Sequence, residues 1–172
     1  MESAACNQKV EPASPSRKRR GCSYNSRMDP TADYHPRYLA GILLFNAGDF
    51  FEAHEVWEDL WADAAGPERR FYQGLIQAAV GLCHFCNGNL RGAAKLYRSS
   101  RDYMEPCGSP FLGLDSAGFW RQMERCFAPI LEQSNADRPV APDEALIPTL
   151  MLDPPPLAWP DPHDFLTAEE QA

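Results

Sequence analysis

Apolar residues recur at helical spacing through the middle of this chain. Between residues 36 and 134 several windows repeat apolar side chains at every third or fourth position, and none alternates apolar and polar residues with a period of two. Glycine and asparagine interrupt these windows. The pattern predicts an all-α domain with helices at 36–47, 50–63, 68–87, 90–104 and 115–134.

Two of the interruptions have the composition of short connections between helices. "NAGD" at 46–49 and "CNGN" at 86–89 each place a glycine just after a predicted helix end, where glycine readily takes the left-handed conformation. Aligned on Gly48 and Gly88, "GDFFEAHEVW" pairs with "GNLRGAAKLY", a weak internal repeat with an offset of 40 residues. The repeat resembles tetratricopeptide-type helix pairs. Two units are too few for a solenoid, so we expect a compact bundle of about five helices built from helical hairpins.

Composition changes at both ends of the predicted helical domain, which spans residues 34–134. Residues 1–33 contain the basic run "RKRR" and few apolar side chains, which predicts a disordered arm; a start at Met28 is the alternative. Residues 135–172 contain one basic residue, eight acidic residues and half of the sixteen prolines. We expect a disordered, Pro-rich acidic tail with an extended path. Trp159 and Phe165 are expected to pin it to the domain, with partner binding as the alternative.

Charge and hydropathy exclude several classes of protein. The formal net charge of −8 disfavours binding to nucleic acids, because such binding depends on basic surfaces that neutralise phosphates. No apolar run approaches the roughly 20 residues of a membrane span, and the N-terminus lacks the apolar stretch of a signal peptide. We therefore expect a cytoplasmic protein whose six cysteines stay reduced.

The predicted helix at 50–63 carries two polar residues at the edge of an aromatic face. With a 100° advance per residue, His54 and Glu58 lie one turn apart, beside the face that contains Trp57 and Trp61. Glu55 points away from this edge.

The predicted helix at 68–87 is apolar around most of its circumference, so we expect it to be central. Its polar residues Gln73, Gln77 and His84 form one narrow stripe. Buried amides and imidazoles cost roughly 1 to 3 kcal/mol each without hydrogen-bond partners. We therefore predict a groove between this helix and the preceding one, formed by His54, Trp57, Glu58, Trp61, Gln73, Gln77 and His84.

Three interpretations of this groove are open. In the first, His54, Glu58 and His84 bind Zn²⁺ or Fe²⁺, although "HEVWE" has Glu58 where the HExxH motif has its second histidine. In the second, His54 supported by Glu58 is the general base of an enzyme, and no other catalytic motif accompanies it. In the third, which is favoured over the other two, the cluster is structural: His54 hydrogen-bonds Glu58 or a glutamine and so fixes how the two helices meet.

Grooves that join apolar walls to a few converging polar groups are typical of ligand-binding sites. The predicted function is therefore a module that binds a small molecule or a protein partner, with a metal-dependent hydrolase as the alternative. Cys83 and Cys86 have metal-like spacing but are interpreted as buried core thiols. Arg91, Lys95 and Arg98 are interpreted as a solvated basic face, with anion binding as the alternative.

Two segments, "FNAGDFFEAHEVWEDLW" and "FYQGLIQAAVGLCHFCNGNLRGAAKLY", resemble the bacterial domain of unknown function 309. The resemblance covers about residues 36 to 104 and implies a small all-α fold of packed helical hairpins. It also implies a signature that falls here on His54, Glu55, Glu58 and Trp61. The family name assigns no activity, so the resemblance implies a fold without a reaction.

Overall fold

The structure, a computed structural model, describes residues 33–132 and 140–166. Within these ranges the chain forms α1 (Pro36–Ala47), α2 (Phe50–Asp63), α3 (Gly66–Cys86), α4 (Leu90–Met104) and α5 (Ser116–Leu131), together with the 3₁₀ helices η1 (Glu105–Cys107), η2 (Glu144–Leu146) and η3 (Pro162–Phe165). The described residues contain isolated β-bridges but no strand. The prediction of an all-α domain is confirmed.

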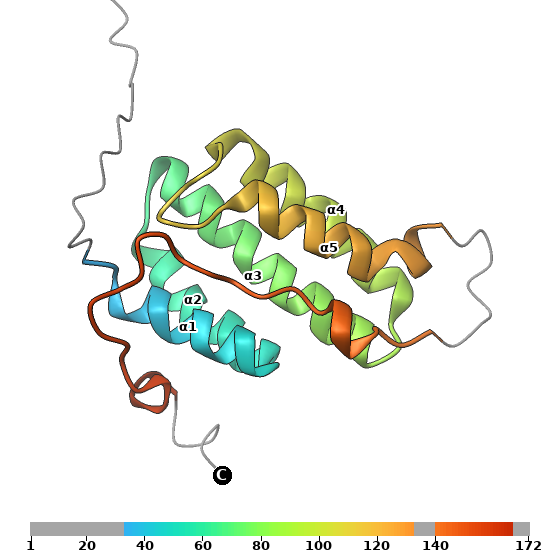
Figure 1. The fold of residues 1–172 in the computed structure, drawn as a ribbon, viewed down its shortest axis with the longest axis horizontal. Coiled ribbons are helices and arrows are strands. Elements are labelled where there is room, and N and C mark those ends of the chain that lie inside the picture. Colours follow the sequence, from blue (N-terminus) through green and yellow to red (C-terminus); the bar gives the residue numbers. More distant parts are fainter. Residues whose placement is uncertain (1–32, 133–139, 167–172) are drawn as a thin grey trace, which may run out of the picture.

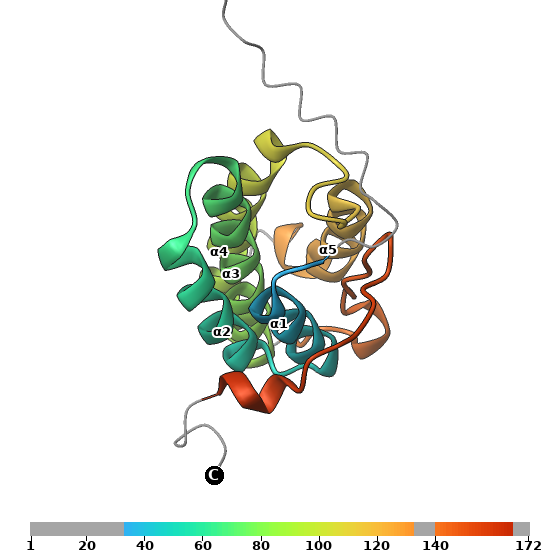
Figure 2. The same cartoon turned by 90° about the vertical axis from the view of Figure 1, so that its left-hand side faces the viewer.

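The helices form two layers. Figure 2 shows α2, α3 and α4 side by side in one layer, with α1 and α5 packed across it. The prediction that the third helix is central is confirmed, because α3 packs against both α2 and α4 and contributes fully buried side chains to the core. These are Phe71, Leu75, Ala78, Ala79, Leu82 and Phe85.

Two glycines end helices in the way that the sequence predicts. Gly48 follows α1 with a φ of 92°, and its N–H bonds the carbonyls of the last turn. Gly88 follows α3 with a φ of 74°. The next residue, Asn89, caps α4 by accepting a hydrogen bond from the backbone N–H of Gly92. These turns fold α1–α2 and α3–α4 into hairpins, whereas their tetratricopeptide-like pairing stays a prediction.

The two helices of the first hairpin approach closely where Gly41 faces Trp57. A Cβ atom added at Gly41 would lie 2.1 Å from Nε1 of Trp57. The Trp57 side chain is fully buried, and its indole N–H donates to the Tyr38 carbonyl at 3.3 Å. Trp57 is therefore a core residue, and not a wall of the predicted groove.

Residues 140–166 cross the outside of α1 and α5 (Figure 1), so the expectation of a disordered tail does not hold for this part. Leu150 is buried, and the Tyr34 hydroxyl donates to the Pro154 carbonyl at 2.7 Å. Phe165 packs against the core, whereas Trp159 is 46% exposed. The predicted arm at 1–33 lies outside the described residues, apart from Asp33.

Other properties predicted from composition can be compared with this structure. In the described ranges no helix is both long and apolar enough to cross a bilayer. Cys83, Cys86, Cys107 and Cys126 are free thiols. The prediction of a buried core thiol is wrong for Cys86, which is exposed because it ends α3.

Candidate ligand-binding site

His54 bonds to its own helix. Its half-buried imidazole hydrogen-bonds the Phe51 carbonyl through Nδ1, and the centroids of the Phe51 and His54 rings lie 4.7 Å apart. Glu58, one turn further along α2, is exposed. The structure therefore satisfies His54 with a backbone carbonyl, and not with the carboxylate or glutamine that the structural interpretation expected.

The polar stripe on α3 is half-buried along its length. Nδ1 of His84 lies 3.3 Å from Nδ2 of Asn89, so His84 belongs to the turn between α3 and α4. Oε1 of Gln77 is buried without a hydrogen-bond partner, as is Oε2 of Glu55 on α2. The polar residues of the predicted groove thus find different partners or none, instead of forming one network.

The structure does not assemble a metal site from the predicted ligands. Across residues 33–132 and 140–166, no three His, Cys, Asp or Glu side chains are arranged to hold a metal ion. His54 bonds within α2, and His84 lies at the end of α3. The geometry therefore gives no support to the alternative of a metal-dependent hydrolase.

A cavity of about 230 Å³ lies beside the connection between α2 and α3. Two of its lining residues, Trp61 and Gln73, belong to the predicted groove. The others come from the first turns of α3 and the last turn of α4: Gly66, Arg69, Arg70 and Tyr103. At this end of the predicted contact between the second and third helices, the described residues therefore form a cavity.

Two stacked arginines determine the chemistry of this cavity. The guanidinium carbon of Arg69 lies 3.9 Å from the ring centroid of Trp61, and that of Arg70 lies 5.8 Å from the ring centroid of Tyr103. Both are cation–π geometries, in which the ring face attracts the positive charge. The lining includes no carboxylate, so its charged groups are two cations in a chain of net charge −8.

Arg69 is held in place by backbone carbonyls as well as by Trp61. Its Nη1 donates to the carbonyls of Trp61 at 2.9 Å, Ala62 at 3.2 Å and Ala64 at 3.3 Å. These carbonyls belong to the last turn of α2 and to the residue that caps it, and the Trp61 carbonyl also accepts from the Ala64 N–H at 3.3 Å. Arg69 therefore closes the end of α2 and fixes one wall of the cavity.

Cys107 lies next to this cavity, with its Sγ 3.5 Å from the Pro67 carbonyl. Burial raises the pKa of the Cys107 thiol, and the positive charge of Arg70 offsets part of that rise. The thiol therefore stays protonated at neutral pH, and it is a neutral neighbour of the cavity.

Sequence reasoning missed Arg69, Arg70 and Tyr103. The pair "RR" near the start of α3 was a usable signal, because an arginine eight or nine residues after Trp61 can return to its ring across the tight connection between α2 and α3. Tyr103 had no such signal, since only the packing of α4 against α3 brings it to Arg70.

The cavity lies largely within a segment that matches a known family. Residues 38–96 match the domain of unknown function DUF309. This segment of the chain is a DUF309 domain. The predicted family is confirmed, and every lining residue of the cavity except Tyr103 lies in the DUF309 domain.

The relatives are uncharacterised bacterial proteins. Over 72 residues the chain is 35% identical to a protein of Aquifex aeolicus (strain VF5), a match that covers 41% of this chain and 22% of the relative. Over 69 residues it is 36% identical to YpuF of Bacillus subtilis (strain 168), covering 39% of this chain and 40% of YpuF. The chain thus spans less than half the length of either relative.

A solved structure is also similar. The crystal structure of a conserved hypothetical protein from Thermus thermophilus has a TM-score of 0.47 and 31% sequence identity, over 51% of this chain and 92% of that one. The name of that protein gives no ligand or activity.

Proposed function

We propose that this protein binds a small molecule carrying an oxyanion, such as a phosphate or carboxylate group, in the cavity between Trp61, Gln73 and Tyr103. The single observation that carries the proposal is the charge of the lining, which includes two arginines and no carboxylate. Guanidinium groups recognise phosphate and carboxylate oxygens with parallel N–H donors.

Preorganisation supports binding at this place. Arg69 is held by three carbonyls and an aromatic ring before any ligand arrives. Arg70 is held less tightly, by its contact with the Tyr103 ring, so its N–H groups are the more available donors. A side chain that is already ordered loses less entropy on binding, which favours affinity.

Volume limits the ligand. At about 230 Å³ the cavity is below the roughly 300 to 1,000 Å³ of drug-sized sites. The two aromatic rings offer flat walls to an apolar or planar group beside the anion. We therefore propose a ligand of few atoms. Four residues of the predicted groove do not line this site: His54, Glu58, Gln77 and His84.

The test compares two arginine variants in a titration with inorganic phosphate. Phosphate should raise the melting temperature of the wild-type protein, because a ligand that binds the folded state stabilises it. Arg70→Gln should abolish this rise. Arg91→Gln is the matched control, since Arg91 is exposed on α4 and does not line the cavity.

Calorimetric titration with benzoate, a planar carboxylate, completes the experiment. Binding of phosphate or benzoate that depends on Arg70 supports the proposal. The proposal fails if neither anion binds, or if Arg91→Gln weakens binding as much as Arg70→Gln does.

A further inference from the structure

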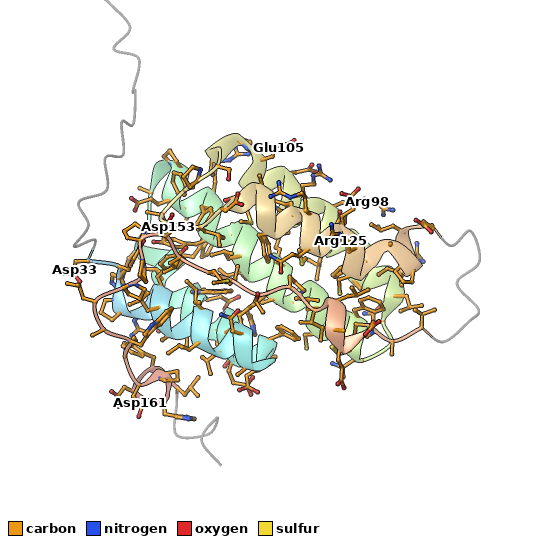
Figure 3. The ribbon with its side chains drawn as sticks, viewed as in Figure 1. Asp33, Arg98, Glu105, Arg125, Asp153 and Asp161 are labelled. Carbon is orange, nitrogen blue, oxygen red and sulfur yellow. The ribbon has the colours of Figure 1, made fainter. Side chains whose placement is uncertain are left out.

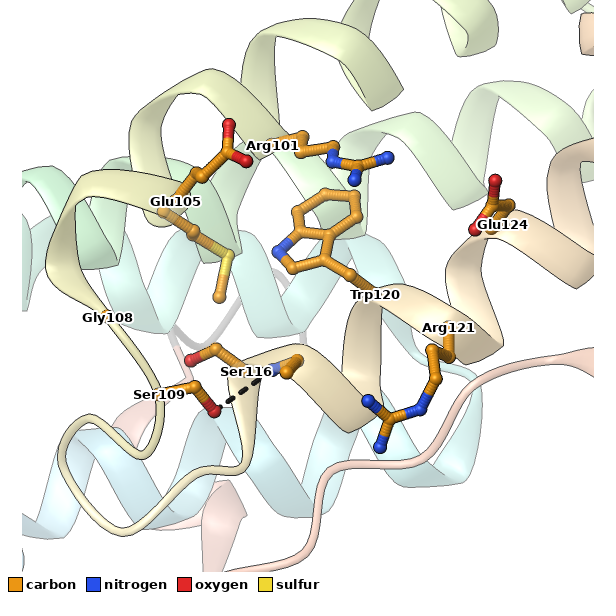
Figure 4. Close-up of a pocket in the computed structure, with 10 residues that line it drawn as sticks. Arg101, Glu105, Gly108, Ser109, Ser116, Trp120, Arg121 and Glu124 are labelled. Carbon is orange, nitrogen blue, oxygen red and sulfur yellow. Dashed lines mark hydrogen bonds between the residues drawn. The ribbon is translucent and has the colours of Figure 1, made fainter.

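A second cavity, of about 290 Å³, lies between the last turn of α4, the 3₁₀ helix η1 and the first turns of α5 (Figure 4). All of its lining residues follow residue 96, so it lies outside the DUF309 segment. It shares no residue with the cavity at Trp61. Whatever it binds is therefore a separate property of this chain.

Two buried donors in the lining have no hydrogen-bond partner. They are Oγ of Ser116 and Nε1 of Trp120, in side chains that are 4% and 8% exposed. An indole N–H can only donate, so its missing partner must be an acceptor. The other buried indole in the described residues is that of Trp57, and its N–H donates to the Tyr38 carbonyl.

Figure 4 shows the indole nitrogen of Trp120 on the edge of the ring that faces the side of the cavity where Ser116 and Glu105 lie. Ser116 is also the first residue of α5, a helix of 16 residues, and the N-terminal end of a helix favours negative charge. The backbone donors there are already used, because Asp115 accepts from Gly118 and Ser109 from Ala117. An incoming acceptor would therefore bond to side chains.

Charged residues of both signs surround these donors. Arg101 and Arg121 line the cavity together with Glu105 and Glu124. Nη2 of Arg121 lies 3.6 Å from Oδ2 of Asp115, which is not part of the lining. Figure 4 shows the Arg101 guanidinium beside the six-membered ring of Trp120, where its positive charge belongs to the same lining. The apolar wall is Met104, which is fully buried.

We propose that this cavity binds the carboxylate of a small molecule. One carboxylate oxygen accepts from Nε1 of Trp120, the other accepts from Oγ of Ser116, and the positive charge of Arg101 in the same lining favours the anion. The observation behind this assignment is the pair of buried, unpartnered donors in the lining of one cavity.

The experiment follows the indole N–H resonances of protein labelled with ¹⁵N-tryptophan during titration with sodium acetate. Sodium chloride at equal ionic strength is the reference, and Trp120→Phe assigns the resonance. We expect a saturable shift of the Trp120 resonance with acetate only, and no shift of Trp57. Ser116→Ala and Arg101→Gln should each weaken the acetate affinity several-fold, whereas Arg98→Gln should not.

Arg98 is a suitable control because it is exposed on α4 and does not line the cavity. Figure 3 shows it away from Glu105. The proposal is overturned if acetate and chloride give the same shift, if Trp120 does not respond, or if Glu105→Gln moves the free resonance as acetate does. That last result would identify the Glu105 carboxylate as the acceptor. Because the readout is specific to Trp120, failure here is distinct from failure at the Trp61 cavity.

Discussion

Asn46 and Leu150 exchange two hydrogen bonds across 104 positions of sequence. Nδ2 of Asn46 donates to the Leu150 carbonyl at 2.8 Å, and the Leu150 N–H donates to Oδ1 of Asn46 at 2.8 Å. One amide side chain thereby satisfies both backbone groups of a buried residue in an extended segment. This pair is the main polar link between α1 and residues 140–166.

Asn46→Ala should loosen residues 140–166. It leaves two backbone groups near a buried side chain unpaired, at a cost of roughly 1 to 3 kcal/mol in the free energy of unfolding. Hydrogen exchange should show faster exchange at the Leu150 amide. Gln122→Ala is the control, because Gln122 accepts one bond, from the Thr149 N–H, and should have a smaller effect. Unchanged exchange at Leu150 in Asn46→Ala would contradict this account.

Gly41→Ala should destabilise the first hairpin. The new methyl group would lie 2.1 Å from Nε1 of the fully buried Trp57, so α1 or the indole must shift. Overpacking of this kind typically costs about 1 to 3 kcal/mol. Urea denaturation measures the loss, with Glu58→Ala at an exposed position of α2 expected to change stability by less than about 0.5 kcal/mol. Equal stability of the two variants would argue against close packing at Gly41.

His54→Ala should leave the metal content of the protein unchanged. The imidazole bonds the Phe51 carbonyl, and the described residues gather no set of three metal-binding side chains around it. Elemental analysis of untagged protein purified without chelator makes the measurement. Near-stoichiometric zinc or iron in the wild type that disappears in the variant would revive the hydrolase alternative.

Gln77→Met should be neutral or stabilising. Oε1 of Gln77 is buried without a partner, and removing an unsatisfied polar atom at nearly constant volume removes a desolvation cost of about 1 to 3 kcal/mol. Thermal melts compare the melting temperature of this variant with that of Gln73→Met, a substitution at a residue that lines the Trp61 cavity. A clear loss of stability in Gln77→Met would show that this amide has a partner in solution.

Stability should fall as the pH rises from about 9 to about 11, partly through Cys126. Burial raises the pKa of this thiol from its ordinary value of 9.0 to about 11. The unfolded chain therefore releases the proton at lower pH than the folded one, and the stabilisation present below pH 9 is lost through this window. Cys126→Ala should reduce the slope of unfolding free energy against pH. An identical slope in both proteins would assign the effect to other groups.

The local spacing of apolar residues and glycines was sufficient to predict the helices and the turns within the two hairpins. The prediction placed α1 at 36–47 and α2 at 50–63, as observed, because apolar periodicity and the glycine after each hairpin's first helix are local signals. The same reasoning failed for residues 140–166. Prolines exclude a helix there, but they do not reveal that Leu150 is bonded by Asn46.

The candidate site divides in the same way. Trp61 and Gln73 could be predicted from the sequence because both lie on faces defined by the helical repeat. A helical wheel gives the direction of a side chain but not its depth or its partner. For this reason it placed the buried Trp57 in a groove, and it did not predict that His54 hydrogen-bonds the Phe51 carbonyl.

The amino-acid sequence thus determined the helices, their hairpins and the DUF309 family, since backbone propensity and apolar period act over a few residues. Tertiary packing decided which polar groups meet. Arg70 reaches Tyr103, and Trp120 shares a cavity with Ser109, only after α4 and α5 are in position. Both candidate cavities depend on such contacts between helices, because hydrogen bonds and cation–π contacts require distances of a few ångströms that no local pattern specifies.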